Sequence, residues 1–344
     1  MAAGAEALVR GASRLATLLG VHPLVVGLTV VAWGTGSPEL AVTVKASVAA
    51  QTDIAVGNVI GSNICNVLLI LGISAVVSPL VVSRQLVLRD VPVMIGVSAL
   101  VLLLALDGML SRVDGLFLVA LFAGYTALTL RKSFPSAGFT KTRGAAKLTS
   151  SARTGGLQWI VLVALILVGL GLLVLGSRWL VDGAVAIAKA LGMSELIIGL
   201  TVVAIGTSMP EIATSVLAGI RGKSDIAVGN AVGSNIFNLL AALGIASVVS
   251  AEGIRIPPAT LEFDLPVMIV VALACMPIFF TGHRVARWEG ALFLFYYVCF
   301  TTFLVLDVVG HEALPTYRSA MLTFVLPVTG VMLVTLVVRA ARGK

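Results

Sequence analysis

Residues 34–39 read GTGSPE and residues 206–211 read GTSMPE, each within an otherwise apolar stretch of chain. Both place a glutamate, Glu39 or Glu211, directly after a helix-breaking proline. A charged side chain at the centre of a bilayer costs about 2.5–3.5 kcal/mol on insertion scales, so it is rare unless it faces a cavity or a partner. Because the motif occurs twice, each glutamate has a partner in the other copy.

The two hexapeptides belong to an internal repeat. Residues 19–78 align without a gap on residues 191–250, at an offset of 172, with 34 of 60 positions identical. The blocks DIAVGNVIGSNICN (53–66) and DIAVGNAVGSNIFN (225–238) match best, and RDVPVM (89–94) resembles FDLPVM (263–268). Each copy contributes five predicted spans. Since five is odd, the second copy enters the membrane from the opposite side, which is the inverted repeat of many secondary transporters.

Composition places the chain in the membrane. Its 344 residues are 59% hydrophobic and 11% charged, whereas soluble domains carry about 25% charged residues. Several apolar runs exceed the roughly 20 residues that span a bilayer, and they do not alternate as barrel strands do. We therefore expect an all-α polytopic membrane protein, with spans near 3–18, 23–50, 54–79, 88–106, 113–130, 157–187, 195–220, 226–249, 263–281, 287–306 and 319–338.

These spans divide the chain into four predicted parts. Residues 1–130 form the first five-helix repeat, 131–156 a basic cytoplasmic linker, 157–306 the second, inverted repeat, and 307–344 a loop with one extra C-terminal helix. The first span, 3–18, is too short to cross the membrane fully, whereas its counterpart in the second repeat, 157–187, begins with a complete apolar segment. Either the start is truncated or this half does without a full first helix.

Basic residues set the predicted orientation. Apart from Lys45 and Arg178 within spans, seventeen of the lysines and arginines fall on one side of the membrane and four on the other. The richer side, which includes the C-terminus, is expected to be cytoplasmic. The net charge of +7 therefore orients the protein in the lipid bilayer and does not indicate nucleic acid. No nucleotide-binding loop is present, and nothing in the sequence indicates an obligate protein partner.

Oxygen-bearing side chains accompany both glutamates at one-turn spacing. Residues four apart share a helix face, and this spacing joins each threonine to its glutamate and each serine to its asparagine. Pro38 and Pro210 lack the N–H that would bond the carbonyls of Gly34 and Gly206, so the helix should open there. The candidate set is Thr35, Glu39, Ser62 and Asn66 in the first copy, with Thr207, Glu211, Ser234 and Asn238 in the second.

This donor set predicts ion exchange. Carboxylate, hydroxyl, amide and carbonyl oxygens are hard donors that suit Ca2+ and, by the same logic, Na+. Two carboxylates about 8 Å apart repel by roughly 2 kcal/mol at an effective dielectric of 20. An empty site should therefore resist closure, while one divalent ion or several monovalent ions would relieve it. A transporter that changes its open side only with ions bound must exchange one ion for another across the membrane.

The doubled motif resembles the repeats of the calcium/cation antiporter superfamily, in the sodium/calcium exchanger branch, over residues 8 to about 306. The resemblance implies a prokaryotic Ca2+/Na+ antiporter of the inner membrane with the ions among the set above, joined by Ser208 and by the backbone carbonyls of Ala32 and Ala204. Two departures stand out. Gly36 occupies a position where the family usually has serine, with Ser37 displaced by one, and Asn occupies both 66 and 238, where some relatives have one Asp.

The main alternative is an antiporter that exchanges calcium or another cation for protons. That branch usually carries an acidic residue as GNxxE, whereas Gly57-Asn58 and Gly229-Asn230 are followed by VIG and AVG. An intramembrane protease is disfavoured because HExxH is absent and Asp90 and Asp264 lie at span ends. We expect a transporter that is not an enzyme and uses no cofactor, its Ca2+ and Na+ being substrates.

Some motif residues have a structural alternative. Ser62, Asn66, Ser234 and Asn238 could make interhelical hydrogen bonds instead of binding ions. Two GxxxG pairs, Gly57 with Gly61 and Gly229 with Gly233, favour close helix packing. Asp53 and Asp225 precede spans and are expected to cap their helices.

Overall fold

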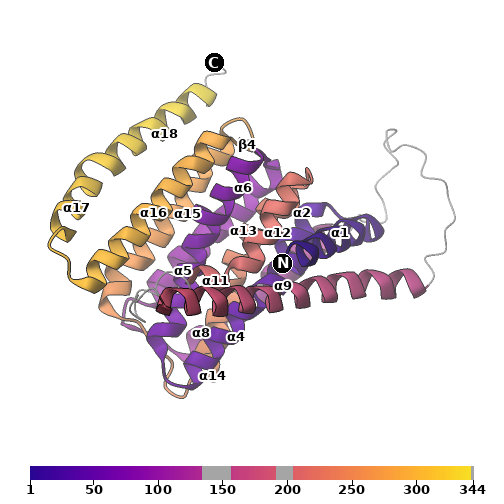
Figure 1. The fold of residues 1–344 in the computed structure, drawn as a ribbon, viewed down its shortest axis with the longest axis horizontal. Helices are drawn as coiled ribbons and strands as arrows, with labels where there is room; N and C mark the ends of the chain where they lie inside the picture. The colour runs from indigo at the N-terminus through magenta and orange to yellow at the C-terminus, as the bar shows by residue number, and fades with distance from the viewer. Residues whose placement is uncertain (134–155, 191–203, 342–344) are drawn as a thin grey trace.

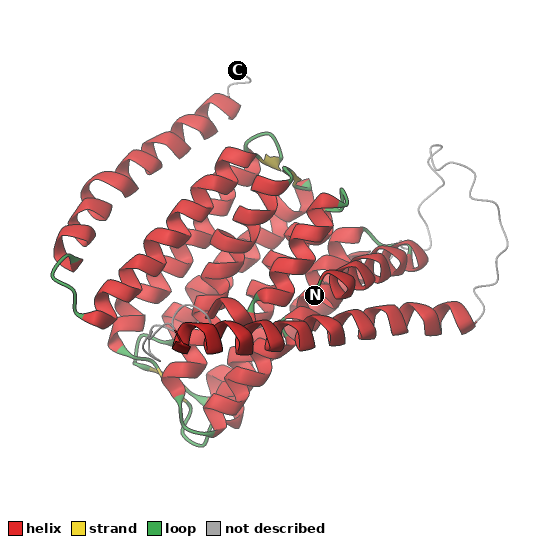
Figure 2. Cartoon of the chain, viewed as in Figure 1, coloured by secondary structure: helices red, strands yellow, loops and turns green. Residues whose placement is uncertain are grey.

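The computed structural model describes residues 1–133, 156–190 and 204–341, which form a bundle of helices with four very short strands (Figures 1 and 2). The first half contains α1 (Ala2–Leu19), α2 (Pro23–Val26), η1 (Gly27–Val31), α3 (Ala32–Thr35), α4 (Ser37–Val48), α5 (Thr52–Cys65), η2 (Asn66–Leu71), α6 (Gly72–Val77), β1 (Leu80–Val81), η3 (Leu86–Asp90), α7 (Val91–Leu104), β2 (Met109–Leu110) and α8 (Arg112–Ser133).

The second half repeats this order. It contains α9 (Gly156–Ala190), α11 (Ala204–Thr207), α12 (Met209–Ile220), α13 (Ser224–Phe237), η5 (Asn238–Ala242), α14 (Leu243–Val249), β3 (Ile254–Arg255), η6 (Thr260–Asp264), α15 (Leu265–Phe280), β4 (Arg284–Val285) and α16 (Arg287–Val309). The chain ends with α17 (Leu314–Ala320), η7 (Met321–Val325) and α18 (Leu326–Ala341), a helical segment along the edge of the bundle (Figure 1). The η elements are short π-helical turns within longer helices.

The all-α polytopic membrane fold predicted from the sequence is confirmed. Seven described helices are long and apolar enough to cross a membrane: Thr52–Val77, Leu86–Leu104, Arg112–Ser133, Gln158–Ile187, Ser224–Val249, Thr260–Phe280 and Arg287–Val309. An eighth span is broken, since Pro23–Thr35 and Ser37–Val48 meet at 46°. The predicted span 195–220 lies partly outside the described residues, as does most of the predicted linker 131–156.

Two helices form the centre of the bundle. In Thr52–Val77 and Ser224–Val249, 78% and 83% of an 18-residue apolar stretch is buried inside the bundle. In the other five spans the corresponding share is 6–44%. These are the helices of the two GNxxGSNxxN blocks. Small residues of the second one allow neighbours to come close, whereas a Cβ at Gly57 or Gly61 in the first would meet no described atom within 4 Å. A Cβ added to Gly233 would lie 2.7 Å from the Cα atom of Leu28, and one at Gly229 would lie 3.0 Å from the carbonyl oxygen of Leu24. Close packing is therefore confirmed for the second glycine pair.

Short ribbons join the two halves at opposite ends of the bundle (Figure 2). Strand β1 pairs with β4, and β2 pairs with β3, both antiparallel. Strand β1 of the first repeat occupies the position of β3 in the second, and β2 occupies the position of β4. Exchanging the two repeats therefore turns the β1–β4 ribbon into the β2–β3 ribbon. That exchange is the behaviour of a pseudo-twofold axis, as an inverted repeat requires.

The helix α1 packs along α9 and contacts α12 (Figure 1). Glycines permit the approach to α9, because a Cβ at Gly4 would lie 2.9 Å from the Gly169 carbonyl oxygen. At the other face, Glu6 of α1 pairs with Arg10 and also with Arg221, whose side-chain nitrogen lies 2.9 Å from it. The short first helix is thus held against the second half by packing and by an ion pair.

The predicted aspartate caps are wrong. Helices α5 and α13 begin one residue before Asp53 and Asp225, and the residues that precede these helices, Gln51 and Lys223, make no side-chain cap bond. Both aspartates lie in the first turn instead, where a negative charge is favoured by the helix dipole.

Candidate functional site

Each candidate glutamate begins a helix that follows a break. Glu39 lies in the first turn of α4, after the break at Gly36, and Glu211 lies in the first turn of α12, after the break at Ser208. Proline at the start of both helices explains the break, because it has no N–H to continue the preceding turn. Both carboxylates are 1% exposed, so the breaks direct them into the centre of the bundle.

The two halves interlock at the glutamates. Ser208, just before α12, donates its hydroxyl to Glu39 Oε1 at 3.4 Å. In the other direction, the side chain of Thr35, at the end of α3, lies within hydrogen-bonding reach of Glu211. Thr35 Oγ1 also lies 3.1 Å from Asn230 Oδ1. Residues 169 or more apart in sequence therefore form one polar centre, as the inverted repeat predicted.

A second layer comes from the GSNxxN segments of the central helices. Ser62, Asn66, Ser234 and Asn238 are at most 6% exposed. Thr207, the last residue of α11, is less buried than its counterpart Thr35.

Unpartnered oxygens are concentrated in this centre. Nine buried side-chain polar atoms lack a hydrogen-bond partner in the described part of the chain, and five belong to the predicted set: Glu39 Oε2, Glu211 Oε2, Asn66 Oδ1, Asn238 Oδ1 and Ser234 Oγ. Leaving a buried polar group unsatisfied costs about 1–3 kcal/mol, and more for a charged one. Four of these five atoms can only accept, so the group that satisfies them must be a donor or a cation.

Within the described ranges, no basic side chain forms a salt bridge with either of the two carboxylates. The salt bridges of the described residues involve Glu6, Asp225, Asp90 and Glu252, but neither Glu39 nor Glu211. The same residues contain no group of three His, Cys, Asp or Glu side chains that could hold a metal ion. A cation bound here would therefore depend on hydroxyl and amide oxygens as well as on the carboxylates, which is the chemistry of hard ions such as Ca2+ and Na+.

The backbone carbonyls differ in availability. The Ala32 carbonyl accepts from the Gly36 N–H at 2.9 Å, which leaves one lone pair for another partner. Ala204 is the first described residue of its segment. The carbonyl of Gly206, which Pro210 leaves free of its helical partner, accepts from Ser177 Oγ of α9 at 2.5 Å. Sequence reasoning missed Ser177, and the only signal was a polar residue in a long apolar helix.

The hydroxyl that the first repeat lacks at Gly36 is not supplied by Ser37. The Ser37 side chain points away from the carboxylates and donates to the Trp33 carbonyl at 2.8 Å in an exposed position. An aromatic ring occupies the space instead: a Cβ at Gly36 would lie 3.0 Å from Cδ1 of Phe237. The ring of Phe237 also packs edge-on against Phe122. The site is therefore asymmetric, with Ser208 in one half and no equivalent hydroxyl in the other.

Replacing Gly36 by serine is expected to lower the melting temperature of the purified protein. The added Cβ would lie 3.0 and 3.2 Å from two ring atoms of Phe237, and overpacking of this kind costs about 1–3 kcal/mol. Adding Phe237→Leu to the same chain should recover part of the loss, because the smaller side chain removes the ring contacts, whereas the Ala32 carbonyl oxygen, which is the closest atom at 2.9 Å, stays in place. A Gly36→Ser protein as heat-stable as wild type would contradict this packing.

Two further asparagines hold the helices that carry the glutamates. Asn58 Nδ2 donates to Thr43 Oγ1 at 2.9 Å and to the Glu39 carbonyl at 3.1 Å. Its counterpart Asn230 donates to Ser215 Oγ at 3.0 Å. Sequence reasoning used these asparagines only to argue against a GNxxE motif, although their identity in both copies was visible.

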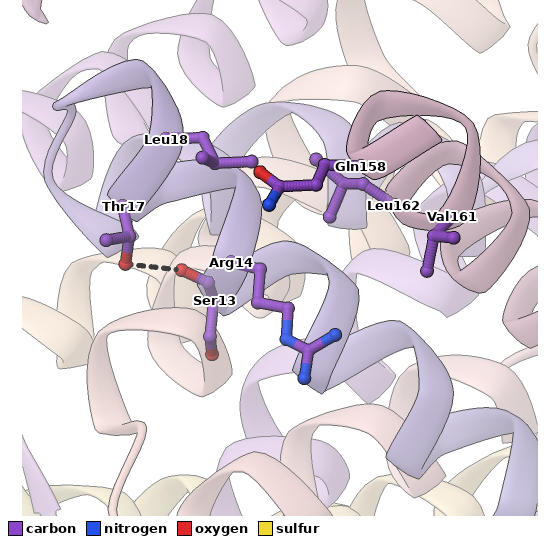
Figure 3. Close-up of a pocket in the computed structure, with 7 residues that line it drawn as sticks. All are labelled: Ser13, Arg14, Thr17, Leu18, Gln158, Val161 and Leu162. Carbon is purple, nitrogen blue, oxygen red and sulfur yellow. Dashed lines mark hydrogen bonds between the residues drawn. The ribbon is translucent and has the colours of Figure 1, made fainter. Parts of the chain in front are cut away.

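A separate pocket of about 540 Å3 lies between α1 and α9 (Figure 3). It is lined by Ser13, Arg14, Thr17, Leu18, Gln158, Val161 and Leu162. None of these residues belongs to the predicted set, and none carries a carboxylate. This pocket therefore does not compete with the buried centre as a cation site.

Known proteins resemble this chain over most of its length. A family model described as "Sodium/calcium exchanger protein" matches residues 1–131 and 161–306. The chain is 39% identical over 274 residues to the inner membrane protein YrbG of Escherichia coli, covering 78% of this chain and 82% of that protein. It is 30% identical over 333 residues to the sodium/calcium exchanger MaX1 of Methanosarcina acetivorans, covering 88% and 94%.

Solved structures of the sodium-calcium exchanger NCX_Mj share the fold. One, soaked with 10 mM Na+ and zero Ca2+, superposes with a TM-score of 0.73 at 31% identity, covering 86% of this chain and 92% of the other.

Proposed function

The chain belongs to the sodium/calcium exchanger family, and from that membership we propose that it is an antiporter exchanging Ca2+ for Na+ at a site built on Glu39 and Glu211. The observation that supports this proposal is a set of five buried oxygens without partners, drawn from both halves, which includes one oxygen of Glu39 and one of Glu211. No salt bridge of the described residues involves either carboxylate. The relatives named as sodium/calcium exchangers support the choice of ions.

The proposed ligand set joins side chains from both breaks and both central helices. It comprises Thr35, Glu39, Ser62, Asn66, Thr207, Ser208, Glu211, Ser234 and Asn238, with the carbonyls of Ala32 and Ala204. Two negative charges match one Ca2+ or two Na+. Since the ligand oxygens come from both halves, a bound ion would hold the halves together and relieve the carboxylate repulsion.

Counter-transport follows from burial and charge. Both carboxylates are 1% exposed, so an ion reaches them only after the helices rearrange. Closing without an ion would leave two uncompensated charges in a low-dielectric interior, which is strongly unfavourable. The protein would therefore change its open side only when loaded, and the inverted repeat provides two related arrangements for the two sides.

The same proposal assigns the parts of the chain. Residues 1–130 and 157–306 act as the two exchanger repeats, 131–156 as a cytoplasmic linker, and 307–344 as an added helix. The excess of basic residues on one side puts those loops and the C-terminus in the cytoplasm of a prokaryotic cell.

Uptake into proteoliposomes tests this function. Vesicles containing the purified protein are loaded with Na+ and diluted into Na+-free buffer with radioactive Ca2+, and a parallel set carries a proton gradient with Na+ absent throughout. We expect Ca2+ uptake that requires internal Na+. Uptake driven by the proton gradient alone would replace the proposal by cation/proton exchange, and absence of uptake in both sets would contradict cation antiport.

A further inference from the structure

Four asparagines form a hydrogen-bonded network where the two central helices cross. They are Asn63 and Asn66 from the first half and Asn235 and Asn238 from the second, all at most 2% exposed. Asn66 Nδ2 donates to Asn235 Oδ1 at 2.9 Å, and Asn238 Nδ2 donates to Asn63 Oδ1 at 3.2 Å. The network thus repeats the twofold relation of the halves.

Backbone carbonyls at the centre of the network fix the orientation of the Asn63 and Asn235 side-chain amides. Asn63 Nδ2 donates to the Asn235 carbonyl oxygen at 3.4 Å, and Asn235 Nδ2 donates to the Asn63 carbonyl oxygen at 3.3 Å. A carbonyl oxygen accepts and never donates, so the atom facing it must be the NH2 group of the side-chain amide. The oxygen of each of these two amides must then face the other way, toward the partner repeat's Asn238 or Asn66.

Two methionines favour the same orientation of these two amides. Asn63 Nδ2 also donates to Met268 Sδ at 3.6 Å, and Asn235 Nδ2 also donates to Met94 Sδ at 3.4 Å. A thioether sulfur is a weak acceptor and has no proton to donate. Both methionines end the matched blocks RDVPVM and FDLPVM. A flipped Asn63 or Asn235 would place its oxygen against a carbonyl and a thioether, with no donor for it.

The orientation of the inner amides also fixes that of the outer amides, Asn66 and Asn238. Because Asn63 Oδ1 and Asn235 Oδ1 accept from Asn238 and Asn66, those outer amides are held by their NH2 groups. Their oxygens, Asn66 Oδ1 and Asn238 Oδ1, are left without partners. Each outer amide therefore presents an acceptor to the ion site and keeps its donor away from it.

We propose that Asn63 and Asn235 are positioning residues that orient the amide oxygens of Asn238 and Asn66 toward the transported cation. The inference deepens the proposed function and rests on it. With an inner asparagine removed, the outer amide loses its fixed acceptor and can rotate, which brings an N–H dipole toward the cation. The expected cost is about tenfold in Ca2+ affinity, which corresponds to about 1.4 kcal/mol.

A double-mutant cycle on purified protein tests this orientation, with Ca2+ affinity measured by calorimetric titration. Asn63→Ala is expected to weaken Ca2+ binding about tenfold, and Asn238→Ala at least as much. Asn63 acts only through Asn238, so the double variant should bind as Asn238→Ala does. In the control cycle, Asn63→Ala with Asn66→Ala, the two losses should multiply, because Asn66 is held by Asn235.

The outcomes separate the two levels of the proposal. Wild-type protein that binds neither Ca2+ nor Na+ overturns the proposed function and the orientation together. Binding by wild type, with losses that multiply for Asn63 and Asn238, overturns the orientation alone. If Asn63→Ala does not fold, the mirror cycle with Asn235→Ala and Asn66→Ala decides. Failure of both alanine variants to fold would make the network structural and overturn the inference.

Discussion

Replacing Glu211 by glutamine is expected to reduce Ca2+ uptake at least about 100-fold, and Glu39→Gln should do the same. Glutamine has the shape of glutamate but no charge, so the bundle can still pack around it. The loss corresponds to about 2.7 kcal/mol, a modest figure for one of two charges that face a divalent ion in a buried site. The measurement is Na+-dependent uptake of radioactive Ca2+ into proteoliposomes.

Glu262→Gln serves as the matched control for that result. Glu262 is an exposed residue of η6, and no salt bridge of the described residues involves it. Its glutamine variant should therefore transport as wild type does. Retention of more than about a tenth of wild-type uptake by Glu211→Gln, in protein that melts like wild type, would contradict the role of the paired carboxylates.

Replacing Gly233 by valine is expected to destabilise the protein by about 3 kcal/mol or more and to abolish transport. A Cβ at this position would lie 2.7 Å from both the Cα and the carbonyl oxygen of Leu28, and 2.9 Å from Ala32 Cβ. Two of these atoms belong to the backbone, so no side-chain rotation relieves the clash. Overpacking by fewer atoms already costs about 1–3 kcal/mol.

The clash also reaches the ion site. Leu28 lies in η1, which continues through α3 to Thr35, so displacing this helix moves a proposed ligand. Melting of the detergent-solubilised protein, followed by the uptake assay, measures both effects. Gly124→Val in α8 is the control, because Gly124 is exposed and a Cβ there meets no described atom within 4 Å. A Gly233→Val protein as stable as this control would contradict the packing.

The internal repeat is what made it possible to predict from the sequence which residues the two halves would bring together. An offset of 172 residues pairs Glu39 with Glu211, and an odd number of spans per copy brings the pair together. Proline at 38 and 210 predicted the helix breaks, since the missing N–H is a property of the residue itself. These inferences needed only local chemistry and the count of spans.

Other features depended on contacts that no local pattern contains. Asn63 lies one residue after Ser62, off the face that joins Ser62 to Asn66, so helical spacing left it unassigned. Its role depends on meeting Asn235 across the twofold axis. The ring of Phe237 over Gly36 likewise joins residues from different halves. Sequence showed that a hydroxyl was missing there, and the structure shows what fills the space.

Competition between the two ions tests the central claim most directly. The dissociation constant for Ca2+ is measured on the purified protein at increasing Na+ concentration, with K+ replacing Na+ to hold ionic strength constant. Because one pair of buried carboxylates would serve both ions, and more than one Na+ is needed to replace the charge of one Ca2+, the dissociation constant should rise more steeply than in proportion to Na+. A dissociation constant that stays the same when Na+ replaces K+ would contradict a shared site.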